Sequence, residues 1–251
     1  MFAQRPWDSR NSAETILLEL VEEAPDEPLY QLELAHHYRN GITAPSFFLR
    51  GRSRVESLGK SVGLLEGLVE KFPDNPRYLF DLADTLAISC REMEYDESPE
   101  EAAKRFEKSI ELARMLHDQF PKLPEYQVLL GNSLRRLSRT REKIGEVKGA
   151  FDLLDESLGH LADISEEWPG LAVYQLSYVR VLHESARLHW KQRDTAQAKA
   201  HFETAIQVAH GKLTKQALPG NSSRDLTQIL HLDLSRLLRS EGKNDEADKL
   251  L

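Results

Sequence analysis

The sequence repeats with a fixed period of 48 residues. The period is marked by tyrosines at 30, 78, 126 and 174, prolines at 25, 73, 121 and 169, and alanines at 102, 150 and 198. A fixed period between about 20 and 50 residues is typical of solenoids and repeat arrays, not of a domain closed around one core. The period therefore predicts an array in which each copy packs mainly against its neighbours.

The repeat divides the chain into a single predicted domain over residues 1–251. Four full copies span 25–72, 73–120, 121–168 and 169–218, and a partial copy covers 219–251. Residues 11–24 match the last third of a copy and predict an orphan helix. Because both ends carry incomplete units, we expect a segment of a longer protein, or ends that pair with something else.

Each copy predicts two antiparallel helices. The first, called helix A, follows a proline turn, because the fixed φ of proline suits the first turn of a helix. Apolar residues then recur at helical spacing, as in Tyr78, Leu82 and Leu86. The second, called helix B, follows a short connection. The chain is therefore predicted to be all-α, with about eleven helices and no strand.

Helix B carries the residues of a family resemblance. Ala198-x3-Phe202-x2-Ala205 is similar to the second helix of a tetratricopeptide repeat (TPR), and Gly242-Lys-Asn-Asp-Glu-Ala247 resembles the turn between TPR helices. The resemblance covers residues 11–251. It implies a right-handed α-solenoid of stacked antiparallel helix pairs, with helix A lining the concave groove. The 48-residue unit is longer than the usual 34 or so, and it resembles TPR segments of large bacterial, planctomycete-type multidomain signalling proteins. Such segments often follow a kinase domain, although no kinase motif is present here.

Composition narrows the range of partners. The 251 residues contain 41 acidic and 33 basic side chains, for a net charge of −8, so we expect no nucleic-acid partner. No apolar run approaches the roughly 20 residues of a membrane span, and the start lacks the apolar stretch of a signal peptide. A cytoplasmic location is therefore favoured, and no membrane insertion is expected. The one cysteine, Cys90, allows no intrachain disulfide.

No pattern predicts an enzyme, a cofactor or a metal. Gly59-Lys60-Ser61 resembles the end of a phosphate-binding loop, but Arg54 stands where that loop needs a glycine. The pair His183-Glu184 would need a second histidine where Arg187 stands, and no two histidines are four residues apart. We therefore predict a non-enzymatic protein with no cofactor and no metal site.

The basic residues of helix A give the one functional signal. Arg91, Arg139 and Arg187 are 48 apart, so stacking should set them in a row. The candidate binding residues on this helix face are Arg91, Asn132, Arg135, Arg139, Arg180, His183 and Arg187. Parallel guanidinium groups suit carboxylates or phosphates. The row therefore predicts a protein-interaction scaffold for an extended protein or peptide partner that is acidic or phosphorylated.

Two other interpretations remain open. Arginines near the end of a helix also complement the negative end of its dipole, and they can bond acids of the next helix B. In that case the chain would be a purely architectural spacer within a larger protein. The sequence does not set the oligomeric state.

Overall fold

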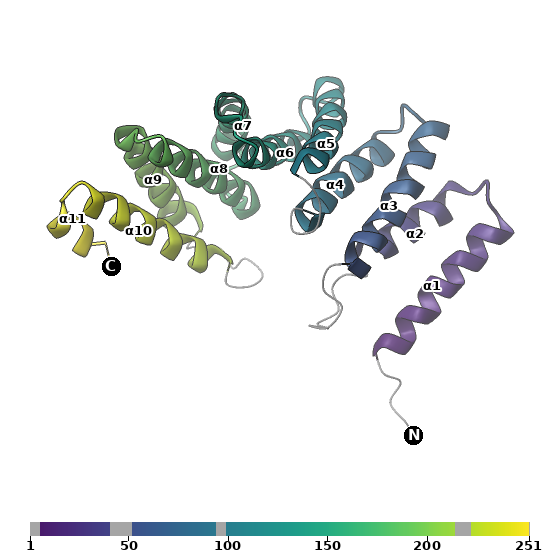
Figure 1. The fold of residues 1–251 in the computed structure, drawn as a ribbon. Coiled ribbons are helices and arrows are strands. Elements are labelled where there is room, and N and C mark those ends of the chain that lie inside the picture. The colour runs from purple at the N-terminus through teal and green to yellow at the C-terminus, as the bar shows by residue number, and fades with distance from the viewer. Residues whose placement is uncertain (1–5, 41–51, 94–98, 214–221, 251) are drawn as a thin grey trace. The chain divides into compact units, whose positions relative to one another are not determined.

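The computed structural model describes residues 6–40, 52–93, 99–213 and 222–250. Over these ranges the chain forms eleven α-helices and no strand (Figure 1), as the repeat predicts. The chain divides into two compact units, Met1–Gln119 and Phe120–Leu251, called unit 1 and unit 2. Each is described by itself, and the single domain over 1–251 stays a prediction.

Unit 1 contains five helices, and each packs against the next along the chain. They are α1 (Pro6–Glu23), α2 (Pro28–Asn40), α3 (Arg52–Lys71), α4 (Pro76–Met93) and α5 (Pro99–Gln119). The orphan helix predicted over 11–24 is α1, which begins five residues earlier. Helices α2 and α4 begin at prolines, as expected for a helix A.

Unit 2 contains six α-helices, again packed in chain order. They are α6 (Pro124–Lys143), α7 (Val147–Glu167), α8 (Ala172–Lys191), α9 (Thr195–Val208), α10 (Ser222–Ser240) and α11 (Asn244–Asp248). A π-helix, Ala209–Leu213, continues α9. It falls in the one full copy that is two residues longer than the others. A π-turn is a common way for a helix to absorb extra residues.

The turns from helix A to helix B in unit 2 share one backbone conformation. Gly145, Arg193 and Gly242 stand at matching places, with φ of 87°, 65° and 80°. A positive φ suits glycine at the end of a helix, because glycine has no Cβ to clash with the backbone. Arg193 therefore bears a backbone strain in this conformation that the glycines of the other two turns do not.

The repeated tyrosines pack at the turns that lead into helix A. In unit 1 the ring of Tyr78 lies edge-on to Phe72, and in unit 2 Tyr126 lies edge-on to Phe120, with centroids 5.9 Å apart in both pairs. Edge-to-face contact is a favourable geometry for aromatic rings. Tyr78 and Tyr126 are thus part of the packing at these turns.

The small and large positions of helix B form the core. Ala150, Ala198, Phe202 and Ala205 are fully buried in unit 2, and Phe106 is fully buried in unit 1. Small side chains at the crossings let the helices approach, and the phenylalanines fill the space between them. The alanines that recur at 150 and 198 therefore lie in the core of unit 2.

A larger side chain at Ala198 is expected to destabilise the protein. Ala198→Leu should lower the free energy of unfolding by about 1–3 kcal/mol, because the site has no room for the added atoms. Urea denaturation measures the change. Ala200→Leu, on the exposed side of the same helix, is the matched control and should stay within about 0.5 kcal/mol of the parent. Equal effects at the two positions would contradict the observed packing.

A buried serine links the two helices of three copies. Ser61, Ser109 and Ser157 each donate a hydrogen bond from Oγ to a helix A carbonyl 26 residues earlier, at 2.7–2.8 Å. The acceptors are Ala35, Ala83 and Gly131. Ala205 takes the equivalent place in the fourth copy, which lacks the bond. These serine bonds satisfy a buried hydroxyl and fix helix B against its own helix A.

Candidate functional site

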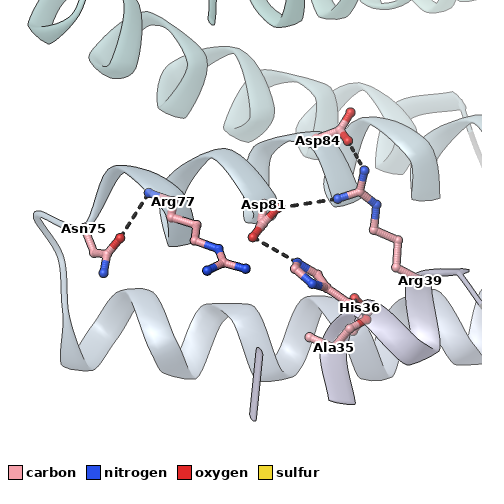
Figure 2. Close-up of polar contacts among 8 residues, drawn as sticks. Ala35, His36, Arg39, Asn75, Arg77, Asp81 and Asp84 are labelled. Atoms are coloured by element: carbon pink, nitrogen blue, oxygen red, sulfur yellow. Dashed lines mark hydrogen bonds and ion pairs between the residues drawn. The ribbon is translucent and has the colours of Figure 1, made fainter. Parts of the chain in front are cut away.

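In unit 1 two basic side chains of one helix A contact acids of the next helix A. The His36 Nε2 lies 3.0 Å from the Asp81 Oδ2, and the Arg39 Nη1 lies 3.6 Å from the Asp81 Oδ1. The Arg39 Nη2 also donates to Asp84. Figure 2 shows His36 and Arg39 of α2 directed at the two carboxylates of α4. His36 and Arg39 are therefore paired within unit 1.

The close-up also shows how α4 begins. The Asn75 Oδ1 accepts a hydrogen bond from the backbone amide of Arg77 at 3.0 Å (Figure 2). The bond satisfies an amide of the first turn, which has no partner within the helix. It holds the start of α4, five residues before Asp81. Arg91 lies near the other end of α4, and its side chain falls outside the described residues.

In unit 2, successive helices A also contact each other through residues 45 apart, but the residue types differ from those in unit 1. The pairs His36–Asp81 and Asn132–Ser177 both join residues 45 apart, and the second lies two periods further along the chain. The Asn132 Nδ2 donates to the Ser177 Oγ at 3.1 Å. Arg39 and Asp84 of unit 1 are also 45 residues apart. Two periods later, the equivalent residues of unit 2 are Arg135 and Arg180. Arg135 therefore faces a cation where Arg39 faces a carboxylate.

The environment of Arg135 agrees with this arrangement. Its side chain is only 12% exposed, and its Nε is buried with no hydrogen-bond partner. The pKa of Arg135 is lowered to about 10, mainly by burial. The charge of Glu184 opposes this lowering, and the charges of Arg136, Arg180 and Arg139 add to it. A guanidinium with this pKa is still protonated at neutral pH. Arg135 is thus a fixed positive charge in a group of like charges.

One carboxylate is shared by two of the arginines. The Glu184 Oε1 lies 3.9 Å from the Arg135 Nη1, and its Oε2 lies 3.0 Å from the Arg187 Nη1. Arg139 is exposed and forms no ion pair among the residues that the structure describes. The face formed by Arg135, Arg139, Arg180 and Arg187 is called the arginine face, and Glu184 lies between two of its members.

His183 belongs to a separate contact. Its Nε2 lies 2.9 Å from the Asp233 Oδ2, and both side chains are 14% exposed. Asp233 also lies 3.1 Å from the Arg236 Nη1. The contact joins α8 to α10, so His183 is engaged inside unit 2. Beside it an open pocket of about 320 Å³ is lined by Arg187, Trp190, Lys191 and Asp233.

The predicted site residues therefore fall into distinct groups. The structure brings Arg135, Arg139 and Arg180 close enough for their charges to interact. Asn132 lies beside them but is bonded to Ser177. The sequence interpretation missed Glu184, although an acid three residues before Arg187 on a helix was a usable signal. Arg135 and Arg187 pair with Glu184, an acid of helix A. One alternative from the sequence had paired the arginines with acids of helix B.

Within the described ranges, no cluster of three or more histidine, cysteine, aspartate or glutamate side chains could hold a metal ion. None of the helices in these ranges combines the length and the apolar character that a membrane span needs.

Comparison with solved structures gives the fold. BtubC (BKLC) from P. vanneervenii is 11% identical with a TM-score of 0.60, and the match covers 99% of this chain and 89% of that one. The putative kinesin light chain with TPR-like repeats from Podosopora anserina is 18% identical with a TM-score of 0.53, over 90% and 92% of the two chains. The RpL4 assembly chaperone Acl4 is 17% identical with a TM-score of 0.54, over 93% and 80%.

These likenesses concern the fold alone, because the identities are low. No family model matches the sequence, and no curated protein matches it either. The helical structure and the TPR-like neighbours agree with each other. The chain therefore has a TPR-like helical repeat fold.

Proposed function

We propose that the chain is a non-enzymatic protein-interaction scaffold, and that the arginine face of unit 2 holds an acidic, extended segment of a partner. The observation that carries the proposal is the contrast between the two units. Arg39 has an acid from the next helix A, whereas Arg135 has Arg180 in that position. A segment rich in carboxylates or phosphates would add negative charge beside Arg135.

The chemistry of the face suits such a segment. Arg135 is charged at neutral pH and is held by packing, so little side-chain freedom is lost when an anion binds. Arg139 and Arg187 are more exposed and can reach a ligand, and a guanidinium can bind a carboxylate with two parallel hydrogen bonds. Solved neighbours of the same fold include a chaperone for RpL4 and a kinesin light chain. Both names are consistent with helical repeats that hold other proteins.

Removing two arginines of the face is expected to weaken binding without unfolding the protein. The probe is a fluorescein-labelled glutamate decamer, followed by fluorescence anisotropy. The double variant Arg139→Ala and Arg187→Ala should bind about tenfold more weakly or worse, because each charge-assisted contact is worth about 1.5–3 kcal/mol. Binding by the parent should also weaken as salt rises, since exposed charges are screened over about 8–10 Å. The melting temperature should barely change.

The matched control removes two positive charges elsewhere in unit 2. Arg193→Ala and Arg236→Ala lie outside the arginine face, and both positions are exposed. This variant should bind the decamer within about twofold of the parent, because only the general attraction of net charge is altered. Equal losses in the two double variants would mean that the arginine face is not the binding surface.

A specific observation also favours the spacer alternative. Contacts such as Arg39–Asp84 in unit 1 and His183–Asp233 in unit 2 join successive helices A from within the protein. If Arg187 has the same role through Glu184, its removal should lower stability and leave partner binding unchanged. The double variant, assayed for binding and for melting, therefore separates a scaffold from a spacer.

A further inference from the structure

We propose that His189, His201 and Asp194, called the histidine cluster, make the turn between α8 and α9 open more readily as the pH falls from neutral to mildly acidic. The cluster lies within unit 2, and the response needs no partner. It gives one helix pair of the array a sensitivity to pH that is built into the fold.

His189 contacts both other members of the cluster. Its Nδ1 lies 3.2 Å from the Asp194 Oδ2. Its ring lies edge-on to the ring of His201, with centroids 5.4 Å apart. On another side its centroid is 4.8 Å from that of Phe151 in α7. His189 is thus held between an acid of the turn, an imidazole of α9 and an aromatic ring of α7.

Asp194 also holds the start of α9. Its Oδ1 accepts a hydrogen bond from the backbone amide of Gln197 at 3.2 Å, so the carboxylate caps the helix. The residue before it, Arg193, has a φ of 65°, which is strained for a residue with a Cβ. Opening of the turn would release this strain. A small change in charge at this turn can therefore shift the balance between its closed and open forms.

Copy three carries the same turn without histidines. The residues 48 positions before the histidine cluster are Arg141, Glu146 and Leu153. Arg141 pairs with Glu146, over the same spacing as the histidine and aspartate of copy four. Gly145 takes the positive φ there without a Cβ. Copy four therefore has two imidazoles, which titrate between about pH 5 and 8, where copy three has a guanidinium and a leucine, which do not.

The surroundings of His201 oppose its protonation. Its Nδ1 is buried and has no hydrogen-bond partner in the described ranges. The pKa of His201 is lowered from the ordinary value of 6.5, mainly by burial and then by the charge of His189. The carboxylates of Asp155 in α7 and Asp194 in the turn raise it in part. Among the described residues, these three are the titratable groups that act on His201 from the elements around it.

The open turn binds a proton more readily than the closed turn. In the open turn the His201 ring is hydrated and regains its ordinary pKa, whereas the closed turn keeps that pKa lower. Well above about pH 6.5 the ring is neutral in both forms, and the proton has no effect on the balance. As the pH falls through about 6.5, the open form takes up the proton first, so its share of the population rises. Protonation of both rings adds repulsion between two positive charges in neighbouring rings.

Hydrogen exchange at two equivalent amides tests the proposal. The Ala198 amide donates to the Asp194 carbonyl in the first turn of α9, and the Ala150 amide donates to the Glu146 carbonyl in the first turn of α7. NMR gives both exchange rates at about pH 7.5 and about pH 5, and each is corrected for the intrinsic rate at that pH. The protection of Ala198 relative to Ala150 should fall about fivefold at the lower pH. An unchanged ratio would overturn the proposal.

The double variant His189→Arg and His201→Leu gives copy four the pattern of copy three. Its ratio should change less than about twofold over the same pH range, because neither new side chain titrates there. His201→Leu alone, which keeps the pair of His189 and Asp194, should also lose most of the fall. The control, His210→Leu, removes an exposed histidine of the same unit and should keep a fall of about fivefold. A fall as large in the double variant as in the parent would overturn the proposal, and so would its loss in the control.

Discussion

Phe202→Ala is expected to lower the free energy of unfolding of unit 2 by about 3–5 kcal/mol, the usual range for a buried phenylalanine. The side chain is fully buried in a cluster with Ala198, Ala205, Leu230 and Leu234. The cluster joins α8, α9 and α10, so the loss would leave a cavity at the centre of unit 2. Urea denaturation followed by circular dichroism gives the free energy, and hydrogen exchange assigns the change to unit 2.

Phe120→Ala is the matched control for this change. Phe120 belongs to the same unit but is 37% exposed at a turn. Its removal should cost less than half as much as the loss of Phe202, because partial exposure leaves less apolar area to lose. A loss below about 1 kcal/mol at Phe202 would contradict the core described for unit 2.

Replacing three glycines of α3 is expected to stabilise unit 1. Gly59, Gly63 and Gly67 lie inside this helix, and a Cβ added at any of them would meet no atom within 4 Å. Alanine is favoured over glycine in a helix by about 0.8–1 kcal/mol per residue. The triple change to alanine should therefore raise the free energy of unfolding by about 2–3 kcal/mol, measured by the same denaturation.

Replacing glycine by alanine is expected to lower the stability at Gly131, in contrast to the three glycines of α3. A Cβ there would lie 2.6 Å from the Leu161 Cγ, where α6 and α7 approach closely. Gly131→Ala gains the helix propensity but must displace Leu161, and overpacking of this kind costs about 1–3 kcal/mol. The net effect should be destabilising. Stabilisation at both places would show that α6 and α7 are less tightly packed than described.

The fold could be predicted from the sequence because its causes are local and repeated. The prolines set the entries of helix A, and the alternation of Ala198, Phe202 and Ala205 sets the side of helix B that is buried. These patterns recur every 48 residues, so each copy confirms the helix assignment of the others. The extension of α1 back to Pro6 lies outside any repeated pattern.

The pairing of charges could not be predicted from the period alone. Equivalent residues are 48 apart, yet the pairs His36–Asp81 and Asn132–Ser177 are 45 apart. The side chains of one helix A therefore meet the next helix one turn earlier than the period suggests. The period therefore predicts a row of Arg139 and Arg187, which are 48 residues apart. It does not predict that Arg135 and Arg180 lie near each other, because these two are 45 residues apart.

The serine bonds of the first three copies determine where bending can occur. Each joins helix A to helix B of the same copy through a buried, uncharged contact. Successive helices A of unit 1 are instead joined by ion pairs such as Arg39–Asp84, which salt screens. We therefore expect unit 1 to bend mainly between successive copies of the repeat and little within a copy. Each helix pair of unit 1 should therefore be stiffer than the contacts between successive pairs. Those contacts should deform more easily as ionic strength rises.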